Sequence, residues 1–210
     1  MNYLALTLSA VFAVALTPIT AKVSARPKSH VGWMVTPLSI AISAVLLWSS
    51  NQLFEVNPAF AVGLSFVSAI LATQVVIDLY VRRLLRELSY AGLLVFVACA
   101  FFVDPMSAHG LKGMAIGALL MTAITAVLVL GSRGALGLGD LHLSPLLGAL
   151  IGWFAPSAVL FSWMITAVAG ALFTSVGLAT KRLSRGAMIP YGPFMVLGAV
   201  ASVAVVAIRS

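Results

Sequence analysis

Long apolar segments alternate with short polar segments along the whole chain. A helix rises 1.5 Å per residue, so about 20 apolar residues cross the hydrocarbon core of a bilayer. The longer apolar runs therefore predict transmembrane helices, whereas the fourth and sixth runs are short and leave open whether they cross fully. The eight runs cover about residues 2–21, 33–49, 59–80, 89–103, 111–130, 141–154, 157–178 and 188–208.

Composition supports a membrane protein. Of the 210 residues, 62% are hydrophobic and only 8% are charged, and the mean hydropathy is +1.14. Such a chain has too little polar surface to cover a soluble globule. We therefore expect an all-α, polytopic transmembrane helix bundle of about eight spans, with residues 1–210 forming a single domain. The first run is expected to be a span and not a signal peptide, since no basic residue precedes it.

The basic residues predict the orientation of the bundle. Ten of the 12 follow the first, third, fifth and seventh runs, and only Lys112 and Arg209 lie at the other ends. By the positive-inside rule, the basic ends face the cytoplasm and both termini lie outside. The ten are Lys22, Arg26, Lys28, Arg82, Arg83, Arg86, Arg133, Lys181, Arg182 and Arg185.

Two other classes of protein are excluded. The net charge of +7 comes from short loops between apolar runs, so it indicates membrane topology and contact with the lipid bilayer, not nucleic-acid binding. Cys99 is the single cysteine, which excludes a disulfide framework or a multi-cysteine zinc site within the chain. We expect no metal and no cofactor.

Two carboxylates stand out because they lie at helix ends on the same predicted face. Asp78 ends the third run, and Asp140 follows Gly137 and Gly139 where the sixth run begins. Acidic residues at the border of an apolar segment are costly and often functional. Two carboxylates in a partly dry site tend to share one proton, which supplies a base for water and an acid for a carbonyl. The other acids are Glu55 and Asp104 in outside loops and Glu87 in a basic loop.

Each carboxylate also has a structural interpretation. Asp140 could cap the helix that follows it, with the two glycines forming the turn. Asp78 could form an ordinary helix-surface ion pair with Arg82, four residues later. Their shared position at one membrane face favours a common site over two unrelated roles.

Three motifs resemble one known family. Gly137-Leu138-Gly139-Asp140 is similar to the GxGD signature of the type IV prepilin peptidases, which are membrane aspartyl peptidases. Ile77-Asp78-Leu79, the basic stretch after it and Leu88-Ser89-Tyr90 resemble the first catalytic segment of that family. Ile189-Pro190-Tyr191-Gly192-Pro193-Phe194 resembles its last-helix motif, usually IPFGPF. The motifs occur in the family's order, and the resemblance covers roughly residues 60–210.

The resemblance implies an activity. Such enzymes cut the short basic leader from type IV prepilins or pilin-like proteins of pilus and protein secretion systems, at the cytoplasmic face of the inner membrane. Two aspartates act with a water molecule and without a metal. Carried over, Asp78 and Asp140 are the catalytic pair, while Gly137, Gly139, His142, Pro190, Gly192 and Pro193 form or position the site.

The chain departs from the family pattern at three places. The family usually has Ile or Leu, Pro, and Asn or Asp where residues 84–86 read Leu-Leu-Arg. Because proline ends a helix, its absence predicts that the third helix continues further into the cytoplasm. His142 stands where Lys is common, and a solvated loop histidine is the alternative to a role in the site. Paired CxxC motifs are missing, so methylation of the product by S-adenosylmethionine is not expected.

Glycines and prolines predict local backbone features. Pro190, Gly192 and Pro193 are expected to interrupt the hydrogen bonds where the last run begins and to offer backbone groups to an extended substrate, although a proline that simply begins a helix is the alternative. The Gly-x-x-x-Gly pairs at Gly113 and Gly148 predict close helix packing inside the bundle in preference to dimerisation. The oligomeric state stays open.

Three hypotheses follow from the sequence. The favoured one is an aspartyl prepilin peptidase. The second is an inactive peptidase-like scaffold of a pilus or secretion system, supported by the missing proline after Asp78. The third is a small proton-coupled transporter, which would place its acids deeper in the membrane.

Overall fold

Each of the eight apolar runs forms one α-helix. The computed structural model describes residues 3–26, 28–53, 57–103, 108–132, 136–184 and 189–209, and within these ranges it contains no strand. The predicted all-α fold is therefore confirmed. The helices are α1 Tyr3–Ser24, α2 Lys28–Leu53, α3 Pro58–Val81, α4 Arg86–Val103, α5 Ala108–Gly131, α6 Leu138–Phe154, α7 Ala158–Ala179 and α8 Gly192–Arg209.

Helix α3 has well-defined caps at both ends. The Asn57 side chain accepts a hydrogen bond from the Ala59 amide, and Pro58 occupies the first turn, where a missing N–H costs nothing. At the other end, Arg82 adopts a left-handed conformation with φ 56°, and its N–H donates to the Asp78 carbonyl. The expectation that α3 continues further into the cytoplasm is therefore wrong, because α3 ends at Val81 without a proline.

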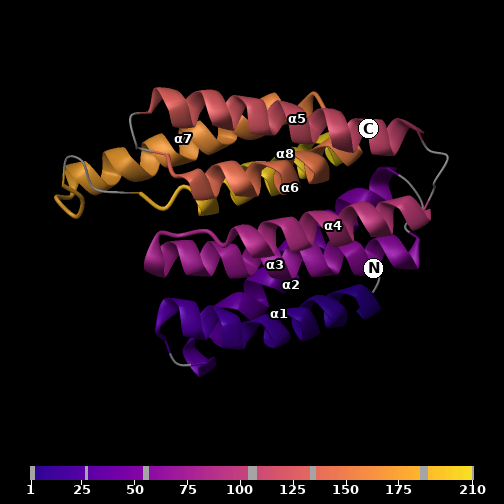
Figure 1. Ribbon diagram of the computed structural model, residues 1–210, viewed down its shortest axis with the longest axis horizontal. Helices are drawn as coiled ribbons and strands as arrows, with labels where there is room; N and C mark the ends of the chain where they lie inside the picture. The colour runs from indigo at the N-terminus through magenta and orange to yellow at the C-terminus, as the bar shows by residue number, and fades with distance from the viewer. Residues whose placement is uncertain are drawn as a thin grey trace.

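The helices form two groups of four. In Figure 1, α1–α4 lie together on one side and α5–α8 on the other, with all helices running along the long axis. Helix α8 joins the groups because it contacts α2 and α3 as well as α6 and α7. Helix α3 is the most buried of the candidate membrane spans, since it packs against α1, α2, α4 and α8.

Helices α5 and α6 pack through their glycines. A Cβ atom at Gly113 would lie within 2.3 Å of the Gly152 carbonyl oxygen, and one at Gly117 within 2.2 Å of the Gly148 carbonyl oxygen. Only glycine permits such a close approach of two backbones. The interpretation of these motifs as contacts inside the bundle is confirmed.

The surface of the helices is suited to a bilayer. Among the described residues, six helices are long and apolar enough to cross a membrane, and α6 is a shorter apolar helix. Large apolar side chains such as Leu119, Leu130 and Leu160 are exposed, which is stable where lipid covers them. The chain is a polytopic helical membrane protein, as predicted. Four of the charged loop residues that the sequence analysis assigns to a membrane face lie outside the described residues: Glu55, Asp104, Arg133 and Arg185.

Candidate active site

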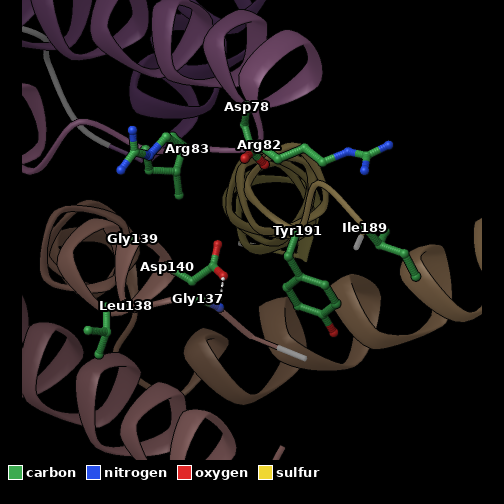
Figure 2. Close-up of a pocket in the computed structure, with 10 residues that line it drawn as sticks. Asp78, Arg82, Arg83, Gly137, Leu138, Gly139, Asp140, Ile189 and Tyr191 are labelled. Carbon is green, nitrogen blue, oxygen red and sulfur yellow. Dashed lines mark hydrogen bonds between the residues drawn. The ribbon is translucent and has the colours of Figure 1, made fainter. Parts of the chain in front are cut away.

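A pocket of about 360 Å³ opens where the C-terminal end of α3, the N-terminal end of α6 and the segment before α8 meet. Both candidate aspartates line it (Figure 2). The pocket therefore draws on both helix groups. Its lining residues are Asp78, Arg82, Arg83, Leu84, Gly137, Leu138, Gly139, Asp140, Ile189 and Tyr191.

Asp78 lies in the last turn of α3 and is only 5% exposed. Its Oδ2 accepts a hydrogen bond of 2.9 Å from the backbone N–H of Gly192, the first residue of α8. No salt bridge joins Asp78 to Arg82 within the described residues, and the Arg82 side chain extends away from the carboxylate in Figure 2. The ion-pair interpretation of Asp78 is therefore wrong, and the carboxylate instead fixes the start of α8.

Asp140 lies in the first turn of α6 and is 6% exposed. Its Oδ2 accepts a hydrogen bond of 3.0 Å from the Gly137 N–H, while its own N–H donates to the Gly137 carbonyl at 3.2 Å. This reciprocal pair stabilises the start of the helix. The structural interpretation is correct only in part, because Asp140 is the third residue of α6 and bonds back to the N-cap residue Gly137, and does not precede the helix as its cap. Capping does not remove Asp140 from the pocket, since only one carboxylate oxygen is used.

The two carboxylates point toward the same space from opposite walls (Figure 2). In each carboxylate, Oδ2 accepts a hydrogen bond from a backbone N–H. Neither Oδ1 atom has a hydrogen-bond partner among the described residues. A pair of this kind can hold one proton between its members, so that one carboxylate activates water while the other donates to a carbonyl oxygen. The geometry thus fits general acid–base hydrolysis.

Leu84 connects the two aspartate segments. A Cβ atom at Gly139 would lie 3.1 Å from the Leu84 Cβ, and one at Gly192 would lie 3.1 Å from the Leu84 Cδ2 and 2.9 Å from the Asp78 Oδ2. Gly137 is different, since a Cβ there would meet nothing closer than 3.7 Å. A methyl group at the second glycine of the GxGD motif or at the glycine of the last motif would therefore displace Leu84 or Asp78, whereas one at Gly137 would not.

The segment before α8 forms another wall of the pocket. Residues 189–191 are not helical, and α8 begins at Gly192, so Pro190 lies before the helix and Pro193 in its first turn. The alternative therefore holds at Pro193, which lies where α8 begins, since the amides of Phe194 and Met195 already donate to the Tyr191 carbonyl. The Gly192 amide binds Asp78 and is not offered to a substrate, contrary to the expectation. Burial and the nearby charge of Asp140 raise the pKa of the Tyr191 phenol, which therefore stays protonated.

His142 lies on α6 and not in a loop, and it is not among the residues that line the pocket. Its Nδ1 is 2.8 Å from the Tyr90 hydroxyl of α4. The two rings also meet edge to face, with centroids 5.7 Å apart. His142 thus links α4 to α6 at a partly exposed position on a helix, so the structure supports neither a loop histidine nor the expected place of His142 in the site.

Six lining residues are absent from the predicted site, and two of them, Ile189 and Tyr191, belong to the last motif. Of the other four, Arg82 and Arg83 carry a topology signal in the sequence and Arg82 also a possible ion pair, Leu84 is a departure from a motif, and Leu138 is the variable position of GxGD. Their proximity to Asp78 or Asp140 in the chain was the available signal. Within the described ranges, no group of three metal-ligating side chains occurs that could hold a metal ion.

Comparisons with known proteins agree with the motifs. A sequence model described as "Type IV leader peptidase family" matches residues 65–175, just over half of the chain, and this range includes Asp78 and Asp140. A "Prepilin leader peptidase/N-methyltransferase" of Bacillus subtilis (strain 168) is 27% identical over 169 residues. That alignment covers 80% of this chain but only 62% of the relative. No solved structure matches significantly.

Proposed function

Because the chain belongs to the type IV leader peptidase family, we propose that it removes the leader peptide from type IV prepilins or pilin-like proteins. The observation that carries the proposal is the placement of Asp78 and Asp140 in one buried pocket at the end of the bundle. This pair would make the enzyme an aspartyl endopeptidase of the GxGD type. Its substrate would belong to a type IV pilus or a related protein secretion system.

The proposed mechanism uses the two carboxylates in complementary states. One ionised aspartate takes a proton from water, and the oxygen of that water attacks the scissile carbonyl carbon. The other aspartate, protonated, donates to the carbonyl oxygen and stabilises the negative charge that develops there. The aspartate that took the water proton then gives it to the leaving nitrogen, the C–N bond breaks, and the proton on the former carbonyl oxygen returns to the other aspartate, which separates the leader from the mature protein. Hydrogen bonds from Gly192 and Gly137 hold the two carboxylates in place during these steps.

We propose that the pocket faces the cytoplasm at the inner membrane. Arg82 and Arg83 line it, and Lys181 and Arg182 follow α7, which ends at the same end of the bundle as α3 (Figure 1). The positive-inside rule then supports a cytoplasmic site and termini on the outer side. Residues 1–210 would act as one domain, since α8 contacts both helix groups.

The name of the Bacillus subtilis relative includes an N-methyltransferase activity, which is stated of that protein. For this chain we propose peptidase activity alone, because the sequence contains one cysteine and no CxxC pair. The inactive-scaffold hypothesis loses its main support, since α3 ends at Val81 despite the missing proline. The transporter hypothesis is disfavoured because both acids lie in terminal helical turns and not at mid-span.

Processing in cells tests the proposal. Co-expression with a candidate prepilin is expected to give a shortened product on gels, and mass spectrometry is expected to find an unmethylated new N-terminus. Asp78→Asn and Asp140→Asn keep side-chain size but remove the ionisable group, so each alone is expected to leave the precursor uncut while the protein accumulates in the membrane. Processing by both variants would refute the two-aspartate mechanism.

A further inference from the structure

Helix α3 ends where the sequence contains no helix breaker. Residues 79–86 include neither proline nor glycine, yet the helix stops at Val81 and Arg82 takes a left-handed conformation with φ 56°. That conformation costs roughly 1 kcal/mol or more for a residue with a Cβ atom. The surrounding structure must therefore hold the loop of residues 82–85, which supplies three of the pocket's lining residues.

The side chain of Gln74 fixes the position of this loop through hydrogen bonds. Its side chain is completely buried in α3, and its Oε1 accepts the Leu85 N–H at 2.9 Å while its Nε2 donates to the Leu85 carbonyl at 2.7 Å. The same Nε2 donates to the Ser89 hydroxyl at 2.8 Å. One amide side chain thus pairs with both backbone groups of the residue that precedes α4. Turning the chain at this point satisfies polar groups that would be costly to bury alone.

The position of Leu85 determines that of Leu84, its neighbour in the chain. Leu84 packs against Gly139, which precedes Asp140, and against Gly192, whose N–H binds Asp78. A shift of the loop would therefore disturb the walls beside both carboxylates. Gln74 itself lies one helical turn before Asp78 on the same face of α3.

We propose that Gln74 is a positioning residue of this peptidase, which holds Leu84 between the two aspartate segments through its paired hydrogen bonds to Leu85. The inference rests on the proposed function for its catalytic consequence only. Gln74 does not line the pocket, so it acts through the loop and has no contact with the reacting atoms. Gln74 fixes the turn after α3 through side-chain hydrogen bonds, whereas a proline would fix such a turn through its ring.

Kinetics with a purified prepilin substrate test the catalytic consequence. Gln74→Met keeps the length and volume of the side chain but removes the three hydrogen bonds. We expect kcat to fall ~10- to 100-fold with a smaller change in KM, because a shifted loop misplaces the pocket wall beside the reacting groups. Thr73→Val is the matched control, since Thr73 is equally buried and its hydroxyl has no partner among the described residues. Equal kcat values for the two variants would overturn the proposal.

Thiol labelling tests the loop position without any substrate. In a Cys99→Ser background, Leu84→Cys places one thiol on the loop, and a water-soluble maleimide reports its accessibility. We expect Gln74→Met to increase the labelling rate several-fold and Thr73→Val to leave it unchanged. An unchanged rate with Gln74→Met would overturn the proposal even if no cleavage is found, whereas faster labelling without cleavage by the wild type would refute only the proposed function.

Discussion

Asp78 and Asp140 each combine a structural and a chemical role. Asp78 accepts a hydrogen bond from the start of α8, and Asp140 from the residue that caps α6. These amides leave the second oxygen of each carboxylate without a hydrogen-bond partner among the described residues, and both residues line the pocket. The structural interpretation of a single acid and the catalytic interpretation of a pair are therefore compatible at Asp140, because one side chain can serve both purposes.

The two glycines of the GxGD motif are expected to differ in their tolerance of a methyl group. Gly139→Ala places a Cβ atom 3.1 Å from the Leu84 Cβ, whereas Gly137→Ala meets nothing closer than 3.7 Å. We expect Gly139→Ala to reduce the rate of leader cleavage ~10-fold or more, since the wall between the aspartates must shift, and Gly137→Ala to stay close to wild type. Initial rates with a purified prepilin measure both, and equal losses would contradict the packing argument.

At the residue scale, the sequence predicted the two carboxylates but not their surroundings. Asp78 and Asp140 could be found because acids are rare in this chain and costly beside apolar segments. For Leu84 the sequence offers only its closeness to Asp78 in the chain, since an apolar loop residue has no distinguishing chemistry. Its role depends on a contact with Gly139, more than 50 positions away, which only the folded chain reveals.

Among the helices, spans were easier to predict than ends. Hydrophobic runs identified all eight helices, and in the six candidate spans the thickness of a bilayer explains the length of the run. Helix α2 extends to Leu53, beyond the predicted run 33–49, because hydrogen bonding continues through Ser49, Ser50 and Asn51 after the apolar pattern stops. The end of α3 was predicted wrongly because Gln74, eleven residues before Leu85, supplies the turn through a tertiary hydrogen bond.

The contact between α5 and α6 gives a stability prediction. Gly117→Ala would place a Cβ atom 2.2 Å from the Gly148 carbonyl oxygen, so the helices must separate. We expect the variant to unfold in detergent with a free energy of unfolding lower by ~1–3 kcal/mol. Gly131→Ala, where a Cβ meets nothing within 4 Å, is the control and should be neutral or slightly stabilising. A thermal unfolding temperature unchanged by Gly117→Ala would refute the close contact.

In the whole molecule, the candidate site is a junction between two helix groups. Asp78 belongs to α1–α4, and Asp140 belongs to α5–α8. Helix α8 packs between the groups, and its first amide is bound by Asp78. The pocket can therefore form only when the groups are correctly assembled, which links the folding of the bundle to the proposed chemistry.

Reporter fusions test the proposed orientation of the bundle. Alkaline phosphatase is active only outside the cytoplasm. Green fluorescent protein becomes fluorescent only when it stays in the cytoplasm, because it does not fold correctly after export in an unfolded state. We expect fusions after Arg209 to give phosphatase activity and fusions after Ser184 to fluoresce, because ten of the 12 basic residues lie at the proposed cytoplasmic end. The opposite pattern would place the pocket outside and contradict a cytoplasmic cut.

The most direct test of the central claim is a double-mutant comparison of cleavage by purified protein in detergent. If Asp78 and Asp140 share one proton and act as a unit, Asp78→Asn and Asp140→Asn should each lower kcat by at least ~10³-fold, and the double variant should be no slower than either single variant. Losses that multiply, or a single variant that retains most of its activity, would show that the two carboxylates do not form one catalytic pair.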